Sequence, residues 1–334
     1  MANSQKTSND AYFQAIFQDY QDRIPQITVN NFKEIGDLIM EKPNMKNEFI
    51  NTLFNKIGLT LLQNKKYTSR LDIFSKGKLE YGETIEQIMC DLIECKDFTE
   101  QKENNEVSEL VSAQVPDIKV LYHSENYKHK YKVTISDIRL RKAFNDKYGV
   151  DKLVASIITS VQNSIAYDRE CMLKAILSAG IYKQSIQVPF DSGSTSSRAK
   201  NLVAEIKKNI IRLETMSKSY NNADINTFTR KEDMVLVIGS EYATDIDINL
   251  LATAFNLDKA EISTRIIVVD ELPVVGEVKP ICVLMDKDYI VDYTTLYEVR
   301  QFENANTLTT NLFYHVWGIM CQNDFTNAIQ FVEA

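Results

Sequence analysis

The longest regular pattern of apolar positions lies between residues 149 and 180 and predicts a long helix. Gly149 precedes the pattern and Gly180 follows it, as expected at helix ends. A helix of about 28 residues is about 40 Å long, well above the usual three or four turns, so we interpret it as a coiled coil or a structural spine, since it is too polar for a membrane span. The apolar side chains at helical spacing are Val150, Leu153, Val154, Ile157, Ile158, Val161, Ile165, Met172, Leu173, Ile176 and Leu177.

Two segments ahead of this helix alternate apolar and polar residues, which is typical of β-strands. Apolar side chains occupy every second position of 118–122 and of 131–135. The polar connection between the two segments predicts that they form one long hairpin. Such a hairpin has few core residues of its own, so it needs another surface to lie on.

The chain after residue 190 alternates loops, helices and short strands. A polar stretch at 191–197 predicts a flexible loop, and the apolar spacing beyond it predicts a helix at 198–216. We expect strands at 234–239, 264–270, 281–286 and 289–293, a helix at 243–255, and aromatic strands within 307–334. Only Lys287 and Asp288 separate two of these strands, which favours a tight hairpin.

The first part of the chain contains two amphipathic stretches, near 10–20 and near 45–62. Both are either helices packed on the chain's own core or an arm that lies across a neighbouring subunit. Residues 84–98 have a mixed pattern that is compatible with helix or strand.

The charge of the chain is unevenly distributed. The formal net charge is −8, which argues against a protein that reads DNA but not against one that encloses it. Between Glu94 and Glu109 six acids and two lysines give −4, and between Lys119 and Lys142 seven basic residues and two acids give +5.

No spacing of chemically active residues predicts an enzyme. The five cysteines fit no zinc pattern and read as reduced thiols, and no phosphate-binding loop or nucleophile motif is present. Two acidic sets are metal candidates, but such carboxylates usually cap helices or face solvent, so we expect no metal and no cofactor. The sets are Glu241, Asp245 and Asp247, and Asp286, Asp288 and Asp292. No signal peptide and no membrane span are predicted.

The order of these elements and several segments resemble the major capsid proteins of small Bacillus-type podophages. The segments are NEFINTLFNKIGLTLL (47–62), FSKGKLEYGETIEQI (74–88), VPDIKVLYHSENYKHKYKVTI (115–135), VASIITSVQNSIAYDRECMLK (154–174), INLLATAFNLDK (248–259) and LFYHVWGIMCQNDFTNAIQFV (312–332). The resemblance runs through nearly the whole chain in one order, and FYHVW is its most recognisable part.

The resemblance implies an α+β tailed-phage capsid fold, also called the Johnson fold. Its regions would be an N-terminal arm at 1–64, an extended E-loop region at 65–148, a peripheral domain with the spine helix at 149–190 and 294–334, and an axial domain at 191–293. Some relatives continue into an immunoglobulin-like domain, and we expect none here because the sequence stops at Ala334.

The resemblance also implies a structural subunit that self-assembles as pentamers and hexamers into the icosahedral head of a double-stranded-DNA phage. The chain would work with a scaffolding and a portal protein, assemble in the host cytoplasm, and enclose DNA without sequence-specific binding or membrane contact. Suspected subunit contacts are Lys128, Lys130 and Lys132 of one copy against Glu103, Glu106 and Glu109 of another, the alternative being that both runs are only solvated.

Two other functions remain open from the sequence. One is an encapsulin-type shell, which shares the fold and packages protein. The other is a nucleotide-binding α/β enzyme built on residues 230–293, although only Gly239 follows the first strand there and the backbone would need more glycines to approach a pyrophosphate.

Overall fold

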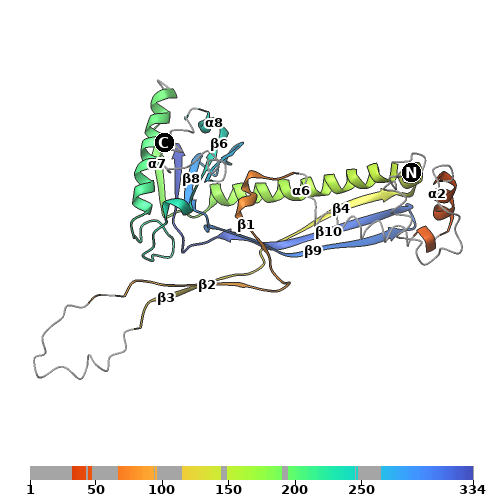
Figure 1. The fold of residues 1–334 in the computed structure, drawn as a ribbon, viewed down its shortest axis with the longest axis horizontal. Helices are drawn as coiled ribbons and strands as arrows, with labels where there is room; N and C mark the ends of the chain where they lie inside the picture. Colours follow the sequence, from red (N-terminus) through yellow and green to blue (C-terminus); the bar gives the residue numbers. More distant parts are fainter. Residues whose placement is uncertain are drawn as a thin grey trace, which may run out of the picture. The chain divides into compact units, whose positions relative to one another are not determined.

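The computed structural model, drawn in Figure 1, forms two compact units. Unit 1 comprises Met1–Ser69, Tyr127–Arg169 and Thr294–Gly318, and unit 2 comprises Arg70–Asn126, Glu170–Tyr293 and Ile319–Ala334. The structure describes residues 32–42, 44–46, 67–93, 95, 115–143, 149–189, 195–244, 246 and 265–333. The amphipathic stretch predicted near 10–20, most of the one near 45–62, and most of the helix predicted at 243–255 lie outside the described residues.

Unit 1 is built from a long helix packed on a sheet. Helix α6 (Gly149–Ala179, 31 residues) begins in this unit and confirms the predicted spine, and Figure 1 shows it running alongside β4, β10 and β9. The sheet has the order β1-β9-β10-β4, with β1 at Ser75–Lys78, β9 at Ile290–Asn304, β10 at Thr309–Gln322 and β4 at Tyr127–Ser136. Unit 1 holds β4 and most of β9 and β10, whereas the residues of β1 belong to unit 2. Helices α2 (Phe32–Glu41) and α5 (Asp137–Ala143) complete the core.

The core of unit 1 follows from the two periodicities of its elements. Ile157, Ile158 and Val161 lie on one face of α6 and are buried against Leu312 and Tyr314 of β10. Strand β4 alternates, so its residues 131, 133 and 135 face this core while 128, 130 and 132 face away from it.

The predicted hairpin between 118–122 and 131–135 is wrong, although both segments are strands. Strand β3 (Ile118–His123) pairs with β2 (Ile85–Cys90), whereas β4 pairs with β10. Pairing with β10 places the apolar side of β4 on the core of unit 1. Pairing with β3 would not do so, because β3 has few core residues. Between the two strands, the Asn126 side chain bonds the backbone N–H and C=O of Met320 instead of closing a turn. Strand β2 also resolves the undecided segment 84–98 in favour of a strand over its first part.

Unit 2 contains a mixed five-stranded sheet with the order β5-β11-β8-β6-β7. Central strands β6 (Met234–Gly239) and β8 (Pro280–Asp286) are buried almost throughout, which explains their continuous apolar sequence. The edges are β5 (Gln184–Val188) and β7 (Ile266–Val269), and β11 (Ala328–Glu333) lies between β5 and β8. Strands β6, β7, β8 and β11 confirm the predicted strands.

Helix α7 covers the sheet of unit 2 with its apolar face. Leu202, Ile206 and Ile210 are buried in the same core as Leu236 and Leu284 of β6 and β8. The helix spans Thr195–Leu213, so it begins three residues before the predicted start and takes in residues expected to be loop. Short elements accompany it, namely η1 (Arg70–Phe74), η2 (Lys231–Asp233) and α8 (Ser240–Ala243).

The predicted hairpin between 281–286 and 289–293 is wrong as well. Strand β8 pairs with β6 and β11, while β9 belongs to the other sheet. Tyr289, which links β8 to β9, is 1% exposed and stacks on Tyr182 with ring centroids 5.8 Å apart. At this buried ring the chain leaves the sheet of β8 and enters the other sheet. A two-residue hairpin would instead return the chain alongside β8.

The end of α6 depends on a glycine that has no room for a side chain. The Gly180 N–H donates to Ile176 O at 2.8 Å, and a Cβ on Gly180 would lie 2.5 Å from the same oxygen and 2.9 Å from Gln322 Oε1. We expect Gly180→Ala to lower the free energy of unfolding by about 1–3 kcal/mol. Urea denaturation followed by circular dichroism measures this change.

Gly239→Ala is the matched control for this substitution. A Cβ at position 239 meets no atom closer than 3.6 Å. The free energy of unfolding of the Gly239→Ala variant should therefore stay near that of the unmodified chain. Equal stability of the two variants would contradict the close approach at Gly180.

Candidate assembly surfaces

One row of lysines runs along the exposed side of β4 in unit 1. Lys128, Lys130 and Lys132 occupy alternate positions of the strand and are exposed, and we call them the lysine row. The Lys128 ammonium lies 4.6 Å from the Trp317 ring centroid, and those of Lys130 and Lys132 lie 5.7 and 5.9 Å from that of Phe313. Cation–π attraction to these rings of β10 holds the three charges over a defined surface.

The sequence predicted these lysines as contact residues but not the rings beneath them. The rings are placed by the register of β4 with β10, in which Lys128 lies opposite Trp317 and Lys132 opposite Phe313. Residues two apart on a strand are about 7 Å apart, so the row presents positive charge at even intervals. The predicted partners Glu103, Glu106 and Glu109 lie outside the described residues.

The second surface is the two-stranded ribbon of β2 and β3 in unit 2. Antiparallel pairing places Ile88 opposite Val120 and Glu86 opposite Tyr122 on the outer face. Ile88 is 61% and Tyr122 68% exposed. The Tyr122 hydroxyl donates to Glu86 Oε1 at 2.9 Å, and the carboxylate raises the pKa of the tyrosine.

The ribbon has its apolar side outward. The outer face carries Glu86, Ile88, Cys90, Ile118, Val120 and Tyr122, and the inner face carries Ile85, Gln87, Met89, Lys119, Leu121 and His123. Counting Cys and Tyr as apolar, one of the six outer residues is polar or charged, whereas three of the six inner residues are. An exposed apolar row of this kind marks a surface that another molecule covers.

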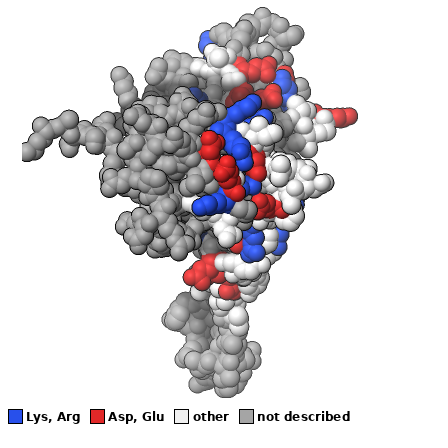
Figure 2. Space-filling model, turned by 90° about the vertical axis from the view of Figure 1, so that its right-hand side faces the viewer, with Lys and Arg blue, Asp and Glu red and all other residues white. Residues whose placement is uncertain are grey.

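Charged side chains do not form a field of one sign on the face drawn in Figure 2. Over the part of that face that the structure describes, basic and acidic side chains are interleaved. Such a mixture offers no continuous basic track for a nucleic-acid backbone, and it suits contacts whose register is set by opposite charges.

The structure brings together one thiol and one imidazole that the sequence did not link. His123 Nδ1 lies 3.1 Å from Cys321 Sγ, and His123 Nε2 lies 3.1 Å from Gln87 Oε1. Burial raises the pKa of the Cys321 thiol to about 11 and lowers the pKa of His123. Both groups are therefore uncharged at neutral pH, unlike the thiolate–imidazolium pair of a cysteine nucleophile, and the contact ties β3 to β10.

The acidic sets considered as metal sites do not converge. Asp286 accepts the backbone N–H of Asp288, whose own carboxylate pairs with Lys76 at 2.6 Å, and Glu241 pairs with Lys279 at 3.5 Å. Asp245 and Asp247 lie outside the described residues. Among those described, no three His, Cys, Asp or Glu side chains are grouped to hold a metal ion, and no helix there is both long and apolar enough to cross a membrane.

Comparison with known sequences gives one consistent result. The family described as Phi29-like phage major capsid protein matches residues 10–332. The major capsid protein of Bacillus phage GA-1 is 29% identical over 316 residues, covering 92% of this chain and 66% of that protein. That of Streptococcus phage Cp-1 is 28% identical over 317 residues, covering 89% of this chain and 86% of that protein. The chain thus spans about two thirds of the GA-1 protein and most of the Cp-1 protein.

Solved structures show the same fold at low sequence identity. The capsid structure of Staphylococcus phage Andhra aligns with a TM-score of 0.55 and 13% identity, covering 81% of this chain and 88% of that one. The capsid structure of cyanophage P-SCSP1u aligns with a TM-score of 0.55 and 12% identity, covering 81% and 89%. These likenesses establish the α+β tailed-phage capsid fold, also called the Johnson fold. With the family match over nearly its whole length, the chain belongs to the Phi29-like phage major capsid proteins, which are structural shell subunits and not enzymes.

Proposed function

We propose that this chain assembles with copies of itself, as pentamers and hexamers, into the icosahedral head of a short-tailed phage that encloses double-stranded DNA. The observation that carries the proposal is the ribbon, whose outer face is more apolar than its inner face. A single copy leaves Ile88 and Tyr122 in water, and contact between copies covers them. Many such contacts, each modest, give a shell that assembles reversibly enough to correct errors.

The parts of the chain take different places in this assembly. We assign 1–64 to an N-terminal arm, 65–148 to an extended E-loop region, 149–190 and 294–334 to a peripheral domain, and 191–293 to an axial domain. The ribbon within 65–148 supports the second assignment, because two paired strands with an exposed apolar face need a neighbour to lie on. The two compact units cut across these regions.

The lysine row is proposed to meet the acidic segment Glu94–Glu109 of a neighbouring copy. Cys90 at the end of β2 lies opposite Ile118 at the start of β3, so the chain between them, which includes the acids, connects the two strands at one end of the ribbon. Each exposed ion pair contributes about 0–1 kcal/mol. The pairs therefore fix register and orientation more than affinity.

The shell encloses DNA without reading its sequence. A net charge of −8 keeps phosphate from adhering to the protein, so that the packaged polymer can move. We further propose that a scaffolding and a portal protein take part in assembly and that it occurs in the host cytoplasm. The five cysteines, none of them in a disulfide, fit a reducing compartment.

Electron microscopy and nuclease protection test the proposed function. Negatively stained protein, produced alone or with a scaffolding protein, should show closed icosahedral shells. Particles from infected cells should hold DNA that resists added nuclease. A small oligomer that binds nucleotide would favour the α/β enzyme, and shells that package only protein would favour an encapsulin.

The pairing of the lysine row with the acidic segment has its own test. Reversing Lys128, Lys130 and Lys132 to Glu should cut the yield of closed shells at least tenfold, because like charges then face one another. The subunit should stay folded, since the row is exposed and a cation–π contact at an exposed site contributes only about 0.5–1 kcal/mol. Shell yield is measured by sedimentation and folding by circular dichroism.

Two further variants make this test specific. Changing the three lysines to Arg keeps charge and ring contacts, so shells should form normally. Adding Glu103→Lys, Glu106→Lys and Glu109→Lys to the reversed row should restore assembly, because the charges are then exchanged. Normal shells from the reversed row alone, or no rescue by the exchange, would refute the pairing.

A further inference from the structure

The described residues of β2 and β3 belong to neither of the two buried apolar clusters. A cleft of about 400 Å³ lies beside β2, lined by Gln87 and Met89 of that strand and by Thr227 and Phe325 among other residues of unit 2. Hydrogen bonds join the ribbon to the unit instead. One runs from Lys119 Nζ to the carbonyl oxygen of Ala223. The position of the ribbon therefore depends on a few directional polar contacts.

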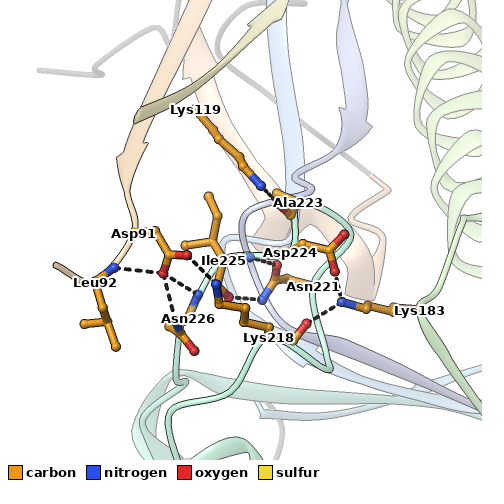
Figure 3. A network of polar contacts seen from close by, with 10 residues as sticks. All are labelled: Asp91, Leu92, Lys119, Lys183, Lys218, Asn221, Ala223, Asp224, Ile225 and Asn226. Carbon is orange, nitrogen blue, oxygen red and sulfur yellow. Dashed lines mark hydrogen bonds and ion pairs between the residues drawn. The ribbon is translucent and has the colours of Figure 1, made fainter. Parts of the chain in front are cut away.

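The most connected of these contacts belongs to Asp91, the first residue after β2. Its Oδ1 accepts from Asn226 N at 3.1 Å, from Asn226 Nδ2 at 2.9 Å and from Leu92 N at 2.8 Å. Its Oδ2 lies 2.7 Å from Lys218 Nζ, and the side chain is only 8% exposed. Figure 3 shows the carboxylate pointing into this set of donors.

Asp91 also closes the ribbon at the end where the connection begins. Its N–H donates to the carbonyl oxygen of Asp117 at 2.9 Å, which brings together the two residues that flank the paired strands. The acidic segment Glu94–Glu109 follows in the sequence after two intervening residues, Leu92 and Ile93. Asp91 thus holds the point from which this segment departs.

The loop that receives Asp91 is shaped by its own contacts. Ser217 and Thr227 form a two-way backbone bridge, and the buried side chain of Asn221 bonds both the N–H and the C=O of Ile225. The loop is held from outside by Lys183, which donates to the carbonyl oxygen of Lys218 at 2.6 Å. None of these bonds involves the ribbon, so the loop keeps its shape independently of it. We call residues 217–227 the socket.

We propose that Asp91 is a positioning residue for assembly, which anchors the ribbon in the socket of its own subunit and so orients the outer face of the ribbon for the neighbouring copy. The orientation of the ribbon is then set before two subunits meet. This inference rests on the proposed role of the ribbon as a subunit contact. The apolar outer row of the ribbon remains available to that neighbour.

The electrostatics of the socket keep the anchor in place over a wide pH range. The hydrogen bond from Lys218, then those from the amides of Asn226 and Leu92, hold the pKa of Asp91 well below its usual value. A carboxyl with a lowered pKa stabilises the folded form fully above its unfolded value near 3.8 and loses this effect as pH falls toward the folded value. Asp117 and Asp224 act electrostatically on Lys218, and Lys119 and Lys183 act on Asp224, and none of these residues is a histidine. Acidification from pH 7 to pH 5 should therefore leave the Asp91 carboxylate ionised in the socket.

Hydrogen exchange measured by mass spectrometry on the full-length unassembled subunit tests the anchor. Asp91→Ala should raise the exchange rate of the Asn226 amide and of the ribbon amides at least tenfold, while those of β8 stay protected. Asp91→Asn keeps an acceptor without the charge and should give an intermediate rate. Asp117→Asn is the matched control, because that exposed acid contacts Asp91 only through its backbone oxygen.

Assembly of the same variants tests the consequence, with light scattering for the rate and electron microscopy for the shape. Asp91→Ala should assemble at least tenfold more slowly or give irregular particles, and Asp117→Asn should behave as the unmodified chain. Unchanged exchange in Asp91→Ala would overturn the anchor. Raised exchange with normal shells would overturn its positioning role. Failure of the proposed function looks different, because the unmodified chain would then form no shells.

Discussion

The ribbon of β2 and β3 is covered on one face only by the described part of its own subunit, and the proposed assembly surface depends on this. The ribbon turns Gln87, Lys119 and His123 toward unit 2 and leaves Ile88 and Val120 outside. Covering one large apolar side chain stabilises a contact by about 1.5–3 kcal/mol. One ribbon therefore contributes a few kcal/mol, and the rigidity of a shell comes from repeating that contact in every copy.

The sequence predicted helices and strands well wherever the apolar residues of a regular pattern are buried in a nearby core. Helix α6 buries Ile158 and Val161 on one face, and β6 and β8 are apolar over nearly all of their length because both of their faces are covered. These patterns report how a segment is buried. They do not report which segment lies beside it, and both wrong predictions arose at that step. The partner of Tyr131 in β4 is Tyr314, far along the chain, and no short-range rule selects it.

The candidate sites divide in the same way. Lys128, Lys130 and Lys132 were predictable, because alternation alone places them on one side of a strand. The Cys321–His123 contact joins residues 198 positions apart, and Asp91 meets Asn226 across 135 positions. A single acid after a strand carries no signal in the sequence. Its importance arises only when the fold places a lysine and several amides around it.

Polar anchoring of the ribbon has a physical reason that apolar packing would not satisfy. If the ribbon packed on its own subunit through its apolar outer face, Ile88 and Val120 would be buried there. The surface that another copy is proposed to cover would then be lost. Hydrogen bonds fix direction, and their net contribution is modest because water competes for the same groups. Asp91 and Lys119 can therefore hold the ribbon in one orientation while its outer face stays available to another copy. The ribbon turns its more polar face inward and its more apolar face outward, which is the reverse of what an isolated soluble domain requires and is the arrangement that a subunit of a larger shell needs.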